Sequence, residues 1–445
     1  MPAFRLRLSM PARITDAEAA GTFLWAKDAP DSFVTSLGPR LGDLGPIPRP
    51  NIELVRLAAT VLAADRSAPR RVPGSNWSRR TMELTVPVWD AARWESISDR
   101  LCTLLAFLSG DSWAIRFVNG RTPKERIAPA ARRSERVVLL SGGADSAIGA
   151  LVAREELAGG AYTLVSHIGA TNLSPIQASV AAQAGLLRPG GDQLHRQIRL
   201  GRGRRRVDGA AFPNEFTTRS RSLLFLSLGL AIASIDKVEL WIPENGFASL
   251  NPPLGADQRG SISTRTTHPT FLSALGSLLG EIGVHATIRN PFERMTKGEM
   301  FGVAAGLVGG GAASTFLSST HSCAHTGHRT FRLPVASHCG VCFGCIVRRS
   351  AFAASQLADN TSYLFSLNRT DLRAYLADKS MERAVREFVA RGVDERDFAA
   401  MALPASYSTR DAAGLSIPPL TGHVGYAAGL AWVERYCCSH SIGGM

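Results

Sequence analysis

Apolar residues alternate with polar ones in three short segments of the first third of the chain. In residues 4–8 two arginines separate three apolar side chains, and the same period recurs in residues 82–88 and 113–117. A period of two is typical of strands that bury one face. The stretches between them have helical spacing instead, in residues 51–65 and 90–108. The pattern predicts an N-terminal α+β accessory domain, which we bound at residues 1–130.

A different pattern begins at residues 137–140, where four apolar residues stand in a row. Such a run is expected of a parallel strand that is covered on both faces. A helical stretch (residues 147–157) and a second strand (residues 162–168) follow, which together make a βαβ unit. Further strands and one buried helix alternate after it, at residues 194–200, 238–242, 285–288 and 218–234. The order predicts an α/β domain with a doubly wound parallel sheet over residues 131–355.

After residue 355 the apolar spacing is helical only. It runs through residues 372–376, 381–389 and 424–436, and predicts a helical C-terminal extension over residues 356–445. The most apolar helix-like run, residues 222–235, is shorter than a membrane span requires. The first residues lack the apolar core of a signal peptide. We therefore predict a cytoplasmic protein without membrane contact.

The chain carries a net charge of +13, and nearly all of its basic residues are arginine. That skew is typical of a genome-wide codon bias. The densest cluster lies in residues 196–206, which hold six arginines and no aromatic side chain on which a base could stack. A solvated basic loop is the favoured interpretation, and nucleic acid stays open as a partner.

The sequence SGGADS (residues 141–146) stands between the first buried strand and its helix. Gly142 and Gly143 allow a close approach of the backbone to a ligand, and a helix N-terminus attracts anions. The hydroxyls of Ser141 and Ser146 can add hydrogen bonds. The loop has neither Walker A nor dinucleotide-binding spacing. It predicts a phosphate cradle, against the alternative of a plain capped turn.

Four of the seven cysteines form a ligand pattern: Cys323, Cys339, Cys342 and Cys345. Four thiolates at such gaps can close a tetrahedron around Zn²⁺, which makes a structural site. An iron–sulfur cluster is the alternative, although the ferredoxin spacing is missing. Histidines that could replace one thiolate crowd the same stretch, at His321, His325, His328 and His338.

Taken together, SGGxDS after a strand and the later Cys…CGxCxxC resemble QueC, the 7-cyano-7-deazaguanine synthase family of PP-loop ATP pyrophosphatases in the queuosine pathway. The resemblance covers residues 134–355. Arg221 begins a segment similar to the family's RNxxFLS helix, and Lys297 lies in a segment similar to its TKxE sequence. The resemblance implies that ATP adenylates the carboxylate of 7-carboxy-7-deazaguanine with release of pyrophosphate. Ammonia would then displace AMP to give an amide, and a second activation would convert the amide to a nitrile.

The resemblance also implies roles for individual residues. Asp145 would hold Mg²⁺ or its waters, while Arg221 and Lys297 would neutralise phosphate charge. The residues that would bind ATP are Ser141, Gly142, Gly143, Asp145 and Ser146. The catalytic set would be Asp145, Ser146, Arg221 and Lys297.

The chain departs from the family on the substrate side. Residues 169–172 replace a GQRH-like segment, and a YPDC-type segment is missing from the region of residues 244–246 and 263–269. Glu244 or Asp257 could supply the carboxylate that a guanine-like ligand needs, or the ligand differs.

The length and both extensions make the chain similar to the longer QueC-like proteins of bacterial Qat anti-phage defence systems (QatC). That resemblance implies partner proteins, one of which could offer an amine to the activated acid. One alternative is a synthase that uses ammonia, and another is a non-catalytic nucleotide sensor. A third is a tRNA-thiolating PP-loop enzyme, but such an enzyme needs a sulfur-carrying cysteine, and the clear cysteines here all belong to the metal pattern. A homodimer stays open.

Overall fold

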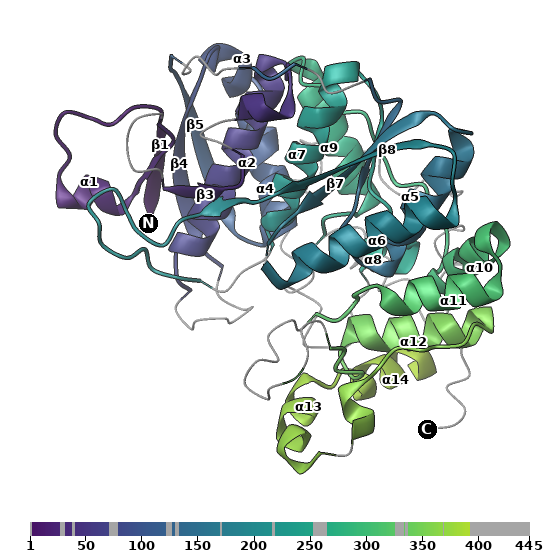
Figure 1. The fold of residues 1–445 in the computed structure, drawn as a ribbon. Coiled ribbons are helices and arrows are strands. Elements are labelled where there is room, and N and C mark those ends of the chain that lie inside the picture. The colour runs from purple at the N-terminus through teal and green to yellow at the C-terminus, as the bar shows by residue number, and fades with distance from the viewer. Residues whose placement is uncertain are drawn as a thin grey trace.

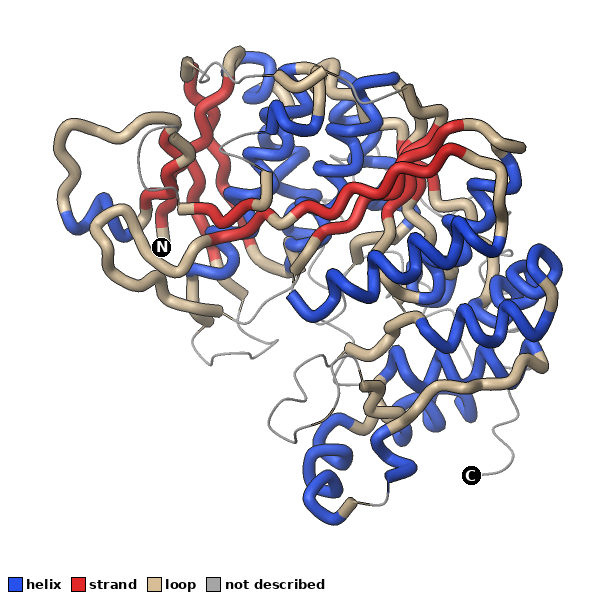
Figure 2. The backbone as a smooth tube through the Cα atoms, in the orientation of Figure 1, coloured by secondary structure: helices blue, strands red, loops and turns tan. Residues whose placement is uncertain are grey.

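The structure, a computed structural model, describes most of the first 391 residues. These are residues 2–26, 32–37, 41–70, 79–121, 127–129, 133–169, 171–215, 219–251, 265–324, 333, 337–367 and 369–391. Two groups of strands lie on either side of a layer of helices, and a further group of helices covers the far side of the second sheet (Figures 1 and 2).

The N-terminal unit contains a four-stranded sheet in the order β2-β1-β4-β5. Its strands are β1 (Ala3–Arg7), β2 (Thr22–Leu24), β4 (Thr81–Val88) and β5 (Ser112–Asn119), and its helices are α1 (Asp16–Ala20), α2 (Arg49–Ser67), α3 (Ala91–Glu95) and α4 (Ser98–Ser109). The alternating segments therefore form strands as expected. All three strand pairs are parallel, a feature that alternation alone does not indicate.

The second sheet is parallel throughout and has the order β11-β10-β6-β7-β8. Its strands are β6 (Arg136–Leu139), β7 (Ala161–His167), β8 (Asp192–Ile198), β10 (Leu240–Trp241) and β11 (Ile288–Arg289). From β6 the chain moves first to one side of the sheet and later to the other. The switch point of the topology thus lies between β6 and β10, where ligands bind in doubly wound folds.

Successive residues of β6 face two different helix layers, which is the arrangement of a doubly wound sheet. Val137 and Leu139 belong to the same core cluster as α7 (Arg221–Asp236) and α9 (Pro269–Glu281). Val138 and Leu140 instead pack with α5 (Ala144–Glu156) and α6 (Ser174–Leu187). The predicted α/β fold class is confirmed.

A single core joins the N-terminal unit to the second sheet. One cluster of buried apolar residues extends from Phe4 to Val284, because α2 packs on α7 and α4 packs on α9. The short strands β3 (Phe33–Thr35) and β9 (Leu200–Arg202) add an antiparallel pair between the two parts. The division of the chain at residue 130 stays a prediction, and the buried core is continuous across it.

Two predicted elements differ in position. The strand predicted at residues 285–288 begins only at Ile288, since the backbone N–H of His285 donates instead to Asn51 Oδ1 of α2 (3.1 Å). The helical pattern of residues 90–108 forms two helices, which meet at Ser96 and Ile97.

The remaining helices surround the far side of the second sheet. They are α8 (Gly246–Leu250), α10 (Lys297–Val308), α11 (Gly310–Ser319), α12 (Phe343–Ser355), α13 (Arg373–Lys379) and α14 (Glu382–Arg391). The expected helix at residues 424–436 lies outside the described residues. Of the helices that the structure describes, none combines the length and apolarity that crossing a bilayer demands.

Candidate active site and metal centre

The SGGADS loop leaves the carboxyl end of β6 and turns directly into α5. Gly142 has a φ of +91°, which strongly favours glycine, and Gly143 caps the helix. The Ser146 hydroxyl donates to the Gly143 carbonyl (3.0 Å) and accepts from the Ser141 N–H (3.1 Å). The two serines thus hold the loop in shape from within.

Substitution of Gly142 by alanine tests this shape. The new Cβ would lie 3.3 Å from Gln177 Cγ in a conformation that costs an L-residue about 1–2 kcal/mol, so we expect lower stability and weaker pyrophosphate binding. Urea unfolding and calorimetric titration with pyrophosphate measure the two effects. Gly302→Ala in α10, where a Cβ meets open space, should instead stabilise by up to about 1 kcal/mol. Equal behaviour of the two variants would contradict the prediction.

Asp145, in the first turn of α5, meets residues from two distant segments. Its Oδ1 lies 2.7 Å from Lys297 Nζ, and its Oδ2 accepts from Asn245 Nδ2 (2.8 Å). Asn245 Nδ2 also donates to Glu244 Oε1 (3.0 Å). Asp145 and Lys297 are both buried. Asp145 follows β6 and Asn245 follows β10, the two strands on either side of the switch point, while Lys297 reaches them from the start of α10, after β11.

Helix caps hold both partners of Asp145 in position. Thr296 caps α10 by accepting from Glu299 N (3.1 Å), and the Glu299 carboxylate accepts from Thr296 N (2.7 Å). This capping box places Lys297 at the first helical position, which gives a physical reason for a threonine and a glutamate around the lysine. Asn245 caps α8 in the same way, by accepting from Ala248 N (3.0 Å).

The two carboxyl groups of the cluster have opposite pKa shifts. Burial raises the pKa of Asp145, but the Lys297 charge and hydrogen bonds from its neighbours outweigh burial and lower that pKa to about 2. Burial, followed by the charge of Asp145, raises the pKa of Glu244 well above its usual value. One carboxylate is therefore firmly ionised while the second favours its proton.

Glu244→Gln tests this asymmetry through the pH dependence of stability. A carboxyl whose pKa is raised on folding stabilises the protein below its unfolded pKa, near 4.5, and this contribution is lost as the pH rises through the folded pKa. A glutamine side chain can still accept the hydrogen bond from Asn245, but it has no proton to lose in this pH range. In magnesium-free buffer we expect the variant to gain Tm relative to the unsubstituted protein from pH 5 to pH 8. If the Tm of the variant and that of the unsubstituted protein changed with pH in the same way, the raised pKa of Glu244 would be contradicted.

Arg221 lies one strand further along the same edge. It begins α7, and a Cβ on Gly169, which follows β7, would be 3.2 Å from its guanidinium nitrogen. The structure thus brings the loop residues together with Lys297 and places Arg221 beside the neighbouring strand. The roles assigned to all of these residues stay predictions. Asp257 lies outside the described residues.

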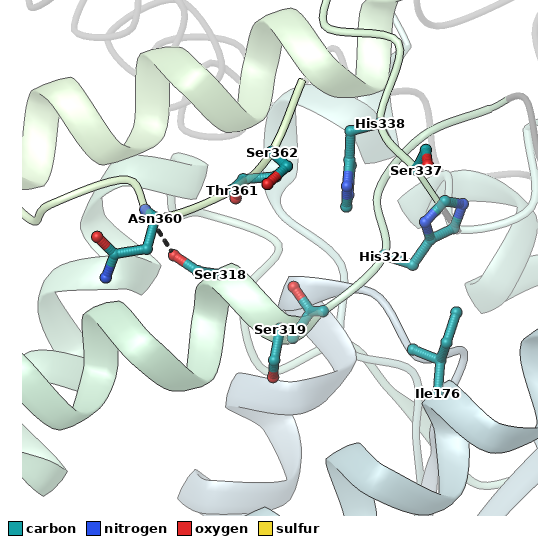
Figure 3. Close-up of a pocket in the computed structure, with 10 residues that line it drawn as sticks. Ile176, Ser318, Ser319, His321, Ser337, His338, Asn360, Thr361 and Ser362 are labelled. Carbon is teal, nitrogen blue, oxygen red and sulfur yellow. Dashed lines mark hydrogen bonds between the residues drawn. The ribbon is translucent and has the colours of Figure 1, made fainter. Parts of the chain in front are cut away.

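A cavity of about 360 Å³ adjoins the loop. The His321 backbone N–H, on its wall, donates to the Gly142 carbonyl (2.9 Å). All but one of the residues that line it carry a hydroxyl, amide or imidazole group (Figure 3): Ile176, Ser318, Ser319, Thr320, His321, Ser337, His338, Asn360, Thr361 and Ser362. The sequence pattern indicated only His321 and His338 among these residues, as spare metal ligands, because the wall is assembled from segments far apart in the chain.

The four predicted cysteines meet in one buried cluster, with all Sγ atoms within 4.8 Å of one another. The Cys323–Cys342 and Cys339–Cys345 Sγ distances are both 3.9 Å. A tetrahedral Zn²⁺ with bonds of about 2.3 Å needs sulfurs about 3.8 Å apart, so the cluster fits zinc. The thiolates suffice for four-coordination without a histidine. His325 and His328 lie outside the described residues.

The C-terminal extension packs around the metal centre and α8. Tyr363 belongs to the cysteine cluster, and Leu376 of α13 packs against it. Phe388 of α14 packs with Phe247 of α8, the helix that Asn245 caps. Since Cys342 also caps α12, loss of the metal would disturb this whole side of the site.

Comparison with known proteins points to the family that the SGGxDS loop and the cysteine pattern resemble. No protein-family model matches the chain. A 7-cyano-7-deazaguanine synthase of Sphingopyxis alaskensis is 31% identical over 249 residues, which are 51% of this chain and 97% of that protein. The chain belongs to the 7-cyano-7-deazaguanine synthase family. A synthase of Desulfatibacillum aliphaticivorans is 25% identical over 53% of this chain and 99% of its own length. One of Psychrobacter cryohalolentis is 27% identical over 35% of this chain and 54% of its own.

Membership of the 7-cyano-7-deazaguanine synthase family confirms the resemblance drawn from the SGGxDS loop and the cysteine pattern. The Sphingopyxis and Desulfatibacillum synthases are matched over almost their full length by about half of this chain. The other half is additional to them.

Proposed function

We propose that the protein is an ATP-dependent synthase that adenylates a deazapurine carboxylic acid, 7-carboxy-7-deazaguanine or a close relative, and releases pyrophosphate. The observation that carries the proposal is the meeting of the SGGADS loop with the Asp145–Lys297 pair at the switch point of the sheet. The activity for which the relatives are named, 7-cyano-7-deazaguanine synthesis, supports the choice of acid.

In the proposed first step, a carboxylate oxygen attacks the α-phosphorus of ATP, and the bond from that phosphorus to the bridging oxygen breaks. Pyrophosphate departs with the electron pair. The N–H groups at the start of α5 and the Lys297 ammonium would stabilise the charge that builds on it. Arg221 would add a second cation.

Asp145 and Glu244 provide oxygen ligands of the kind that Mg²⁺ prefers, within one hydrogen-bonded group. When bound, Mg²⁺ would offset negative charge on the phosphates. Lys297 Nζ would exchange Asp145 for a phosphate oxygen once Asp145 binds a cation. The four cysteines would hold a structural Zn²⁺ that takes no part in the reaction.

In the second step an amine attacks the acyl carbon, AMP leaves, and the amine loses its proton to a base, which forms an amide. With ammonia as the amine, a second ATP would activate the amide oxygen for loss as AMP, which yields a nitrile. With an amine of a partner protein, the acid would become attached to that partner.

We favour the partner protein, and with it a cytoplasmic role in anti-phage defence, because the altered segments at residues 169–172 and 244–246 and both extensions separate the chain from the shorter synthases. The additional half of the chain is where contacts with such partners would lie. A homodimer is compatible with the same proposal.

ATP–pyrophosphate exchange with the full-length protein tests the activity, with 7-carboxy-7-deazaguanine and the uncharged 7-cyano compound run in parallel. We expect exchange in the presence of the acid and none with the 7-cyano compound. The nucleotide product should be AMP. Formation of ADP would instead indicate a kinase, and ATP binding without turnover would indicate a nucleotide sensor.

Mass spectrometry of the products separates the two amines. Incubation with ATP, the acid, ammonia and candidate partner proteins should give a mass increase on a partner. Free nitrile without an adduct would favour the ammonia-dependent reaction.

A further inference from the structure

Three arginines from separate parts of the chain lie close together, and the sequence did not predict this grouping. Arg66 is in the last turn of α2, Arg202 ends β9, and Arg221 begins α7. Arg202 Nη1 donates to the Ser67 hydroxyl (2.9 Å) and reaches the Arg66 carbonyl (3.5 Å). Arg202 lies in the arginine-rich segment of residues 196–206.

The segment that leads into α7 is fastened to the end of α2. The Glu215 N–H donates to the Arg66 carbonyl (2.8 Å), and the Ser220 hydroxyl donates to Asp65 Oδ2 (2.5 Å). Arg221, the next residue, is therefore held close to the last turn of α2. Arg221 also lies beside Gly169, which follows β7, so this arginine links the end of α2 to the carboxyl edge of the sheet.

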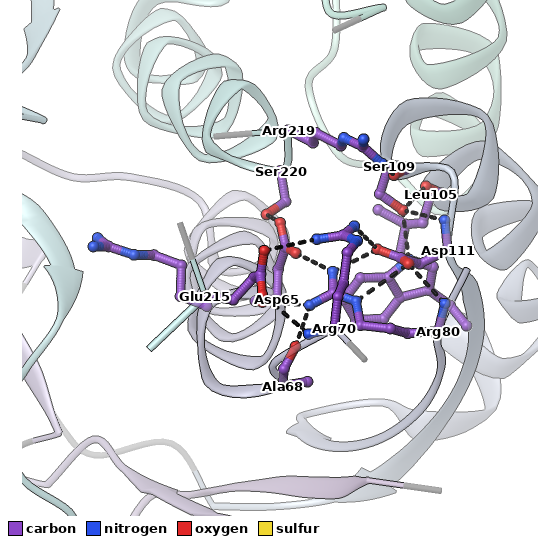
Figure 4. Close-up of polar contacts among 12 residues, drawn as sticks. Asp65, Ala68, Arg70, Arg80, Leu105, Ser109, Asp111, Glu215, Arg219 and Ser220 are labelled. Atoms are coloured by element: carbon purple, nitrogen blue, oxygen red, sulfur yellow. Dashed lines mark hydrogen bonds and ion pairs between the residues drawn. The ribbon is translucent and has the colours of Figure 1, made fainter. Parts of the chain in front are cut away.

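The nearby carboxylates are already used by other arginines (Figure 4). Arg70 pairs with Asp111 (2.9 Å) and Glu215 (3.4 Å), and Arg80 pairs with Asp111 (2.5 Å) and Asp65. With Arg219 close to the same group, this buried network holds three acids and three arginines and is neutral by itself. Among the residues that the structure describes, no ion pair joins Arg66, Arg202 or Arg221 to a carboxylate.

Buried donors of this cluster also lack acceptors. In the described part of the chain, neither Arg66 Nε nor Arg202 Nε has a hydrogen-bond partner, although both atoms are buried. Burial and then the charge of Arg66 lower the pKa of Arg202 to about 10. Arg221 is solvent-exposed along its side chain, yet packing around it and then the Arg66 charge lower its pKa as well. Like charges held together in this way favour an anion between them.

We propose that Arg66, Arg202 and Arg221 form an oxyanion-binding site that extends the region of the SGGADS loop by one strand and takes a carboxylate or phosphate group. Guanidinium groups suit both through paired N–H donors. Arg66 comes from the end of α2, so the N-terminal unit would contribute directly to ligand binding. The identity of the anion rests on the proposed function: it is the carboxylate of the acid or the phosphates of ATP.

Arg66→Met tests the site, because methionine keeps an apolar stem and removes the charge. Calorimetry of the full-length protein at low salt would use three probes, namely inorganic pyrophosphate, ATP with Mg²⁺, and 7-carboxy-7-deazaguanine. We expect about 10-fold weaker binding of at least one probe. Without ligand, loss of the repulsion should raise Tm by about 1–2 °C. A purely structural arginine would lower Tm on removal.

The probes distinguish the source of the anion. Weaker binding of the acid alone assigns the site to its carboxylate, and weaker binding of pyrophosphate and ATP assigns it to phosphate. Arg204→Gln, an exposed arginine of the same segment, is the matched control and should bind all probes normally. Arg202→Gln should weaken the same probe as Arg66→Met.

Unchanged binding of all three probes in Arg66→Met, or no binding of any probe by the unsubstituted protein, would overturn the site. Failure of the proposed function would look different. Exchange activity would then be missing while pyrophosphate binding persisted and still depended on Arg66.

Discussion

Asp145→Asn is expected to abolish ATP–pyrophosphate exchange, with a loss of about 10²–10³-fold, and to destabilise the fold. Asp145 and Lys297 form a buried ion pair, so removing one charge leaves the other buried without its counterion. Such a change costs about 3–5 kcal/mol. Exchange kinetics and urea unfolding measure the two losses.

A double variant separates function from stability at this pair. Asp145→Asn combined with Lys297→Met removes both charges, so most of the stability should return while exchange stays absent. Recovery of exchange in the double variant would mean that the pair has only a structural role. Glu281→Gln removes one partner of the exposed Arg100–Glu281 pair and should leave both exchange and stability unchanged.

Cys342→Ser is expected to give the largest structural loss. Zinc binding supplies on the order of 10 kcal/mol to the folding of small zinc sites, and Cys342 is both a ligand and the cap of α12. We expect the variant to lose zinc and most of its soluble yield. Metal analysis of the unsubstituted protein should find one zinc per chain.

Cys102→Ser is the matched control for the metal centre, since Cys102 lies in α4 and outside the cysteine cluster. It should retain zinc and solubility. A Cys342→Ser protein with a full complement of zinc and an unchanged Tm would contradict the structural role. Chelation should unfold the region of α12 to α14 before the N-terminal sheet, which hydrogen exchange can follow.

Features that depend on neighbouring residues could be predicted from the sequence. The β6–loop–α5 unit follows from a run of four apolar residues, two glycines and a helical pattern, all within a short stretch. The cysteine cluster follows from ligand spacing, because three of its members lie within seven residues. The capping box around Lys297 is local as well, although only the resemblance drew attention to that lysine.

Features made by distant residues could not be predicted in the same way. Asn245 reaches Asp145 across 100 positions of sequence, and nothing near either residue indicates the contact. The displaced start of β11 results from the bond between His285 and Asn51, which only the packing of α2 against the second sheet creates. The convergence of Arg66 with Arg202 has the same origin. Alternation identified the N-terminal strands but carried no information on their parallel pairing.

The continuous core beneath α2 and α7 means that the N-terminal unit cannot be cut away as an independent module. A chain begun at residue 131 would leave the outward apolar surfaces of α7 and α9 in water, and we would expect it to aggregate.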